Sequence, residues 1–270
     1  MRRTSHLVLA GVFAGTFLAA LSAAPAPAIS NGTPDGNLHP QVGLTLRDAD
    51  GDGIPSPGCS GVLIGPTVFL TAGHCAYNLT VYWGVSEAWV TFVPSFDPSD
   101  PWAGKPIHVS RWYWDPNYAG VSGFDDVGVF ILDKAVRGVQ YATLPPASLL
   151  DQMQAAGMLQ SQTFTTVGYG CSTLQGGGPP TFPCDFTRRF ALSPFAALTQ
   201  YFLKVQMNFE ATGAGATNLY DSGAPTFFSD TLLLAGVHSW GDSMGVAMGA
   251  RARLDTASAR AFLDDLVILP

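Results

Sequence analysis

The chain alternates short apolar stretches with turns rich in Gly and Pro, a pattern that favours strands over long helices. Its 30 Gly and 20 Pro residues are spread over 270 positions. Strands are predicted at 42–46, 61–64, 68–70, 80–83, 88–93, 107–113, 127–132, 162–169, 202–209, 232–237 and 246–254. Helices are predicted at 148–156 and after Asp255 or Thr256, either of which can cap a C-terminal helix. The length suits one large core or two fused barrels.

The first 28 residues have the features of a secretory signal peptide. Arg2 and Arg3 precede a 15-residue apolar region at 7–21, and Ala26–Pro27–Ala28 fits the small-residue rule for cleavage. An apolar region of this length is short for a membrane span, although an uncleaved N-terminal anchor is the alternative. We therefore expect an exported, extracellular protein that begins at Ile29 and is not membrane-bound after cleavage.

Charge further limits the class of partner. The sequence has 13 basic and 20 acidic residues; loss of Arg2 and Arg3 leaves 11 basic residues, so the mature net charge is −9. This acidic balance argues against nucleic acids and anionic membranes as partners. We expect no cofactor and a monomer.

Four cysteines allow three disulfide pairings. Export makes disulfides plausible, and proximity in sequence favours Cys59–Cys75 and Cys171–Cys184. Zinc is the rival interpretation, but the cysteines are too far apart for a CxxC ligand pair.

An acidic segment at 48–53 contains Asp48, Asp50 and Asp52 in the spacing of the first half of an EF-hand loop. The twelfth position of such a loop is Cys59 here, where the motif requires a bidentate Glu. The segment is therefore predicted to be the exposed tip of a hairpin and is at most a weak calcium candidate.

Three residues that together can perform nucleophilic catalysis occur in separate motifs. His74 closes the segment CSGVLIGPTVFLTAGHC, where a hairpin ends beside Cys75. Asp126, 52 residues later, opens the apolar strand of the segment FDDVGVFIL. Ser222 lies a further 96 residues on, within LYDSGAP. Because neighbouring residues on a strand face opposite sides, only one of Asp126 and the adjacent Asp125 can meet His74.

In their order and local sequence these motifs resemble the chymotrypsin/trypsin-like serine peptidases. The segments GYG at 168–170 and SWG at 239–241 add to the resemblance, which covers the chain from Ile29 to the C-terminal helix. It implies an all-β fold of two six-stranded antiparallel β-barrels with a C-terminal α-helix. The expected boundaries are a signal peptide at 1–28 and a peptidase domain at 29–270, with barrels at about 29–143 and 158–254 and a helix at about 256–267.

The resemblance also implies a secreted serine endopeptidase that cleaves peptides or proteins through an acyl-enzyme. Ser222 would be the nucleophile and His74 its general base, while Asp126 would hold the imidazole in the required tautomer. The backbone N–H groups of Tyr220 and Ser222 would bind the oxyanion. Cleavage before Ile29 would create an amine that pairs with Asp221.

Tyr220 departs from the family motif GDSGGP, which has Gly at this position. Gly adopts backbone angles that Tyr resists, so Tyr costs about 1–3 kcal/mol if those angles are required. The alternative function is therefore a catalytically weak or inactive homologue that binds peptides or proteins through its edge strands.

The specificity pocket implied by the resemblance comprises Ala216, Thr217, His238, Ser239, Trp240 and Gly241. Ala216 occupies the position where trypsin-like enzymes carry an Asp, so no acid is present for a Lys or Arg side chain. Thr217 and His238 resemble the hydroxyl and histidine pair of the glutamyl-specific branch of the superfamily. Because both groups can donate hydrogen bonds, and a histidine can be charged near neutral pH, we expect a preference for Glu before the scissile bond.

Overall fold

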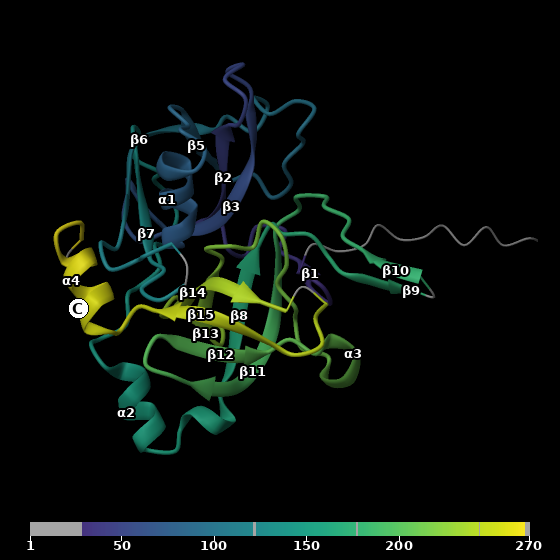
Figure 1. Ribbon diagram of the computed structural model, residues 1–270, viewed down its shortest axis with the longest axis vertical. Coiled ribbons are helices and arrows are strands. Elements are labelled where there is room, and N and C mark those ends of the chain that lie inside the picture. Colours follow the sequence, from purple (N-terminus) through teal and green to yellow (C-terminus); the bar gives the residue numbers. More distant parts are fainter. Residues whose placement is uncertain (1–28, 121–122, 177, 243, 268–270) are drawn as a thin grey trace, which may run out of the picture.

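The computed structural model describes residues 29–120, 123–176, 178–242 and 244–267. Figure 1 shows two β-sheet bodies, one formed by the first half of the chain and one by the second. The predicted signal peptide at 1–28 lies outside the described residues. Within the described residues, no helix combines the length and apolarity needed to cross a bilayer.

The first barrel is closed by six antiparallel strands. Their spatial order is β2 (Val42–Asp48), β3 (Pro55–Leu63), β4 (Val68–Thr71), β7 (Gly128–Leu132), β6 (Ile107–Trp114) and β5 (Ala88–Thr91). Its interior is filled by Leu63, Phe69, Val90, Val109 and Phe130. Gly61 of β3 provides room for Phe69, since a Cβ at this position would come within 2.4 Å of the aromatic ring.

The second barrel has the same strand number and closes through β8. Its order is β8 (Thr163–Gly168), β11 (Arg189–Leu198), β12 (Phe202–Gln206), β15 (Met248–Arg253), β14 (Leu234–Gly241) and β13 (Pro225–Phe228). The short strand β1 (Thr33–Pro34) adds to the edge of β11, so the N-terminal segment is attached to the second barrel. The prediction of two six-stranded antiparallel barrels is confirmed.

Four helices and one hairpin complete the described fold. They are α1 (Gly73–Val81), α2 (Leu149–Ala155), α3 (Phe209–Thr212), α4 (Ala257–Asp264) and the hairpin of β9 (Leu174–Gly176) and β10 (Gly178–Thr181). Thr256 caps α4 by accepting a hydrogen bond from the Ala259 N–H, as the sequence indicated. A 3₁₀ turn at Leu159–Ser161 precedes β8.

One local prediction was wrong. Residues 80–83 were expected to form a strand, but Thr80 and Val81 end helix α1 and Tyr82 is its C-cap. The β-branched and aromatic residues suggested a strand, yet β-propensity is weaker than tertiary context. Here the disulfide Cys59–Cys75 ties the first turn of α1 to β3. The second predicted disulfide, Cys171–Cys184, encloses the hairpin of β9 and β10.

The two barrels share an apolar layer. Val42 and Leu44 of the first barrel belong to one buried cluster with Val167, Phe227 and Val237 of the second. Burial of apolar side chains contributes about 25 cal/mol per Å², so this layer favours a fixed arrangement of the barrels.

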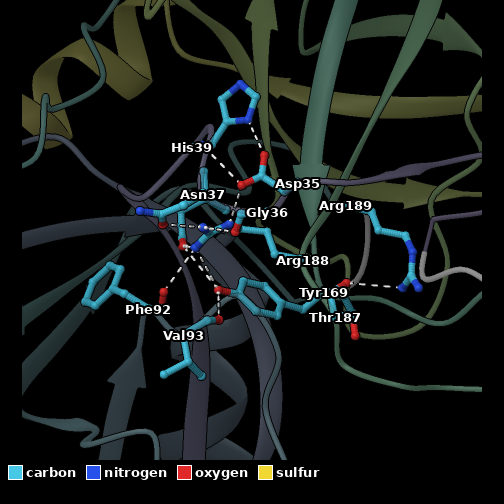
Figure 2. Close-up of polar contacts among 11 residues, drawn as sticks. Asp35, Gly36, Asn37, His39, Phe92, Val93, Tyr169, Thr187, Arg188 and Arg189 are labelled. Atoms are coloured by element: carbon cyan, nitrogen blue, oxygen red, sulfur yellow. Dashed lines mark hydrogen bonds and ion pairs between the residues drawn. The ribbon is translucent and has the colours of Figure 1, made fainter.

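A buried arginine crosses the same interface (Figure 2). Arg188 precedes β11, and its side chain is fully buried. It donates hydrogen bonds to the Asp35 carboxylate at 2.8 Å, to the carbonyls of Val42 and Phe92 at 3.0 and 3.1 Å, and to the Tyr169 hydroxyl at 3.1 Å. Because these acceptors belong to the N-terminal segment and both barrels, one side chain connects all three.

Asp35 supplies the charge that Arg188 requires. Burial alone would raise the pKa of Asp35, but hydrogen bonds from His39 and Arg188 outweigh it and lower the pKa below its usual value. A buried ion pair of this kind depends on the presence of both partners, because either charge alone would be buried without compensation.

Candidate active site

His74 is the second residue of α1, immediately after β4 has ended at Thr71. Its backbone N–H donates to Asp126 Oδ1 at 2.7 Å, and its ring Nδ1 lies 2.9 Å from Asp126 Oδ2. A carboxylate accepts hydrogen bonds, so this contact favours the proton on Nδ1. The other ring nitrogen, Nε2, then carries a lone pair and can act as a base.

Asp126 lies just before β7 and is buried. Its Oδ2 also accepts a hydrogen bond from the Ser239 hydroxyl at 2.5 Å, so two groups satisfy this oxygen. Ser239 was expected to line the substrate pocket; its contact with Asp126 was not foreseen from the sequence. No motif linked the two residues, which are 113 positions apart.

Asp125 is directed elsewhere. It has a positive φ of 52°, and the Ser258 hydroxyl of helix α4 donates nearby to the Asp115 carboxylate at 2.9 Å. Burial raises the pKa of Asp125, and the neighbouring Asp115 adds to the effect. The structure therefore brings Asp126, and not Asp125, to His74.

Ser222 lies in the loop before β13 and is partly exposed. Its carbonyl accepts a hydrogen bond from the Ser60 N–H at 2.8 Å. The next residue, Gly223, packs so closely on the segment before His74 that a Cβ would lie 2.1 Å from Thr71 Oγ1 and 2.8 Å from Ala72 N. These contacts bring the serine loop and the histidine segment together across the barrel interface.

No hydrogen bond joins the side chains of Ser222 and His74 within the described residues. In proteins without substrate, contacts between nucleophile and base are often longer than in the complex, and they shorten on binding. The arrangement at Asp126 is thus formed in advance, while the contact at Ser222 is not.

Tyr220 adopts a positive φ, the backbone conformation that was expected to be unfavourable for a Tyr. Its φ is 70°, and it is the third residue of a turn closed by the Asp221 N–H and the Asn218 carbonyl at 3.0 Å. Its carbonyl accepts from the Ser60 hydroxyl at 2.9 Å, and its ring packs edge-on against Phe186. These contacts hold a Tyr in a conformation for which Gly is favoured.

Asp221 is a fully buried acid. Its carboxylate accepts hydrogen bonds from the N–H groups of Gly170 at 2.8 Å and Asn218 at 2.9 Å. Burial raises the pKa of Asp221 to about 7, although these hydrogen bonds and the charge of Arg251 oppose the rise. Within the described residues no ion pair joins Asp221 to a cation.

The segment that follows the expected cleavage point is already inside the protein. Ile29 is fully buried, and the backbones of Ser30 and Ala216 exchange two hydrogen bonds of 2.9 and 3.1 Å. Ala216 lies six residues before Ser222, so this pairing brings the N-terminal segment beside the loop of the candidate nucleophile.

The expected pocket residues Thr217 and His238 are in contact. Thr217 Oγ1 lies 3.3 Å from His238 Nδ1, and both side chains are buried. His238 also contacts Arg251 of β15, whose Nη1 lies 2.6 Å from the same Nδ1.

The sequence allowed His238 to carry positive charge near neutral pH, but its surroundings in the structure disfavour the charged form. Burial, the charge of Arg251 and the nearby His74 together lower the pKa of His238 well below its usual value. His238 is therefore neutral near pH 7, and the charge at this position belongs to Arg251. The sequence signal for Arg251 was its place between Ala250 and Ala252 in a strand that also contains Arg253.

A cavity of about 410 Å³ opens beside His74. It is lined by His74, Tyr118, Gly120, Gly123, Asp126, Ser239 and Trp240. Trp240 is half exposed and packs edge-on against Phe202. A peptide could therefore lie against Trp240 and Gly241 with its scissile bond near His74.

The acidic tip expected between two strands lies between β2 and β3. Asp48, Asp50 and Asp52 offer carboxylate oxygens within 4.8 Å of one another. The Asp48 carboxylate already accepts the N–H groups of Gly51 and Gly53, as an ordinary turn would require.

A model of the trypsin family matches residues 30–258. The chain belongs to the trypsin family. Two solved structures share the trypsin-like serine peptidase fold. One is described as HL collagenase, with 15% identity, a TM-score of 0.62 and coverage of 85% of this chain and 94% of the other. The second, described as HBP, has 17% identity, a TM-score of 0.64 and coverage of 88% and 96%. A search of curated proteins finds no significant match.

Proposed function

We propose that this trypsin-family protein is a secreted serine endopeptidase that hydrolyses peptide bonds through Ser222, His74 and Asp126. The observation that carries the proposal is the pair of hydrogen bonds from His74 to the buried Asp126 carboxylate. This pair leaves Nε2 of the imidazole free to accept a proton from a serine hydroxyl.

The reaction proceeds in two steps. Ser222 Oγ attacks the substrate carbonyl while His74 takes its proton, and the tetrahedral intermediate collapses to an acyl-enzyme as His74 protonates the leaving amine. Water, deprotonated by His74, then hydrolyses the ester. The N–H groups of Tyr220 and Ser222 stabilise the oxyanion in both steps.

Removal of residues 1–28 completes the enzyme in this proposal. The new amine of Ile29 pairs with Asp221, which is buried and lies directly before Ser222. The burial of Ile29 and the backbone pairing of Ser30 with Ala216 support this step, since both keep the N-terminal segment close to the serine loop.

The proposed preference is for Glu before the scissile bond. Ala216 provides no acid to attract Lys or Arg, whereas Thr217 and His238 provide groups that can donate to a carboxylate. The substrates are therefore peptides or proteins with exposed acidic side chains.

A second candidate function is a catalytically weak or silent homologue that binds peptides or proteins. The observation that favours it is the φ of 70° at Tyr220. A Tyr in this region costs about 1–2 kcal/mol, so the loop has a reason to relax to a state that lacks one oxyanion donor. Loss of one donor lowers the rate by about 10²- to 10³-fold.

A fluorophosphonate label separates the two functions. An activated serine reacts with this probe, so the peptidase predicts labelling of the wild-type protein and none of the Ser222→Ala variant. Absence of labelling in protein that is folded, disulfide-bonded and begins at Ile29 would support the silent homologue. Labelling that persists in Ser222→Ala would refute the assignment of the nucleophile.

A further inference from the structure

Arg251 is a buried cation that the proposed catalytic steps do not use. It lies on β15 directly opposite His238 of β14, and its side chain is completely buried. Nε donates to Thr226 Oγ1 at 3.0 Å, and Nη1 contacts His238 Nδ1 at 2.6 Å. The remaining nitrogen, Nη2, is buried without a hydrogen-bond partner among the described residues.

This contact determines where the proton of His238 lies. A guanidinium has only donors, so His238 Nδ1 must accept from Arg251 and cannot carry a proton. The single proton of the neutral ring is therefore on Nε2, which becomes a fixed donor. Thr217 Oγ1, 3.3 Å from Nδ1, lies on the same side of the ring as Arg251.

Glycines leave space around these groups. A Cβ at Gly249 would lie 2.5 Å from Arg251 Nη1 and 2.5 Å from Met207 Sδ, while one at Gly241 would lie 3.3 Å from His238 Cε1. Gly241 belongs to the segment expected to line the substrate pocket. Gly241 therefore lies against the His238 ring, and Gly249 lies against the Arg251 guanidinium.

The surrounding charges keep Arg251 positive and His238 neutral. The ionisable groups that act on His238 are Arg251 and His74, and Asp221 is the acid that acts on Arg251. Burial lowers the pKa of Arg251 to about 10, which still leaves it protonated at neutral pH. Arg251 therefore supplies a positive charge beside His238 throughout the neutral pH range, in which a glutamate side chain is ionised.

We propose that Arg251 determines the acidic specificity of the pocket by acting through His238, which it holds as the Nε2–H donor for a substrate carboxylate. Arg251 is a positioning residue and a source of positive charge; His238 is the group that touches the substrate. The proposal rests on the proposed peptidase function and adds that the charge is permanent. Selectivity for acidic substrates is then independent of histidine protonation.

Paired peptides that differ only in Glu or Gln before the scissile bond test this proposal. The two side chains are nearly isosteric, so the ratio of their kcat/KM values measures recognition of charge and cancels changes in the catalytic groups. We expect wild-type protein to favour Glu by about 10- to 100-fold, because a buried guanidinium attracts a carboxylate more strongly than it attracts a neutral amide. The ratio should stay constant between about pH 6 and pH 9, because neither Glu nor Arg251 titrates there.

Two substitutions separate charge from hydrogen bonding. Arg251→Gln keeps an N–H donor for His238 but removes the charge, and the Glu/Gln ratio should fall to near one at pH 8. Because His238 then loses the repulsion of Arg251, its pKa should rise and the ratio should partly recover as the pH falls. Arg251→Lys restores the charge and should retain most of the ratio.

Nuclear magnetic resonance of the histidine side chains provides a readout that does not need turnover. In Ser222→Ala protein, with His238 assigned through His238→Gln, we expect a neutral Nε2–H ring throughout about pH 5 to pH 8. Adding Arg251→Gln should raise the pKa of His238, because the repulsion of Arg251 is lost while the burial of the ring remains. A proton on Nδ1, or a titrating His238 in protein that retains Arg251, would overturn the proposal.

The outcomes distinguish this inference from the peptidase function. Failure of wild-type protein to react with fluorophosphonate would refute the peptidase, while the resonance experiment would still decide the role of Arg251. Active enzyme with a ratio near one, a ratio that follows histidine titration, or a ratio unchanged by Arg251→Gln would overturn the inference alone. If Arg251→Gln fails to fold, the pH profile and histidine resonances of proteins that retain Arg251 give the decision.

Discussion

Replacement of Asp221 by Asn should have opposite effects on two forms of the chain. One form, called the extended chain, retains residues before Ile29. In it the Asp221 carboxylate is buried with two backbone hydrogen bonds and no ion-pair partner among the described residues. In a chain that starts at Ile29, the proposed function places an ammonium group beside it. Asn preserves size and removes the charge, but its amide NH₂ replaces one of the two oxygens that accept the N–H groups of Gly170 and Asn218.

The magnitude for the extended chain follows from the pKa of Asp221. Burial raises it from 3.8 to about 7, and a rise of this size corresponds to about 4 kcal/mol. Because the folded chain then binds the proton more tightly than the unfolded chain, stability decreases as the pH rises from about 4 to about 7. Asp221→Asn should remove this pH-dependent loss, a gain of up to about 4 kcal/mol for the extended chain above pH 7. The backbone N–H that Asn leaves without an acceptor should cost about 1–3 kcal/mol at every pH, so the substitution should destabilise near pH 4 and stabilise above pH 7.

The mature chain should respond in the opposite direction. Removing one member of a buried ammonium–carboxylate pair leaves the other charge uncompensated and costs about 3–5 kcal/mol. Asp221→Asn should therefore destabilise the chain that begins at Ile29 at pH 7 and above.

Urea unfolding followed by tryptophan fluorescence, at intervals from pH 4 to pH 8, measures both effects. Ser222→Ala in every sample prevents self-cleavage and serves as the common background. Destabilisation of the extended chain at pH 8 would show that Asp221 already has a cationic partner there. Stabilisation of both forms would refute the pairing of Ile29 with Asp221.

Three further predictions follow from other contacts. Tyr220→Gly should be more stable than Tyr220→Ala by about 1 kcal/mol in thermal unfolding, because only Gly relieves the positive φ; equal stabilities would contradict that backbone angle. Asp126→Asn should lower kcat by about 10³- to 10⁴-fold in a peptide assay, whereas Asp125→Asn should be mild, and a severe effect of the latter would reverse the assignment. Arg188→Met should cost about 3–5 kcal/mol of unfolding free energy by leaving Asp35 uncompensated, with a smaller loss for Arg189→Met, whose partner Asp185 is partly exposed; equal losses would exclude a special role for the interface network.

The strand pattern and turn residues of the sequence favoured many short strands, and the resemblance to the serine peptidases implied the two-barrel fold. Alternation of apolar and polar positions is a local property, so most strands, the short helix at Leu149–Ala155 and the cap at Thr256 were predicted close to their observed positions. The disulfide pairings were likewise favoured by proximity in sequence. The end of α1 was not predictable in this way, because the disulfide to β3 outweighs the strand propensity of residues 80–83.

In the candidate site, too, some features were evident from the sequence and others only from the structure. The motifs around His74, Asp126 and Ser222 were recognisable because each is a short contiguous segment. The resemblance favoured Asp126 over the adjacent Asp125 as the acid that meets His74; in the structure the backbone turns at Asp125, with its positive φ, and Asp126 contacts His74. The strain at Tyr220 could be anticipated from the residue type, but its φ of 70° comes from the folded loop.

Long-range electrostatics depended entirely on the tertiary structure. The sequence indicated that His238 can be charged near neutral pH, whereas burial and the adjacent Arg251 lower its pKa and leave the arginine as the cation. Arg188 had no local signal either, because its partners come from three separate segments. Patterns along the chain therefore determined which elements form and which short motifs carry the chemistry. Only the folded protein determined protonation and pairing, because these depend on burial and on charges that are distant in sequence.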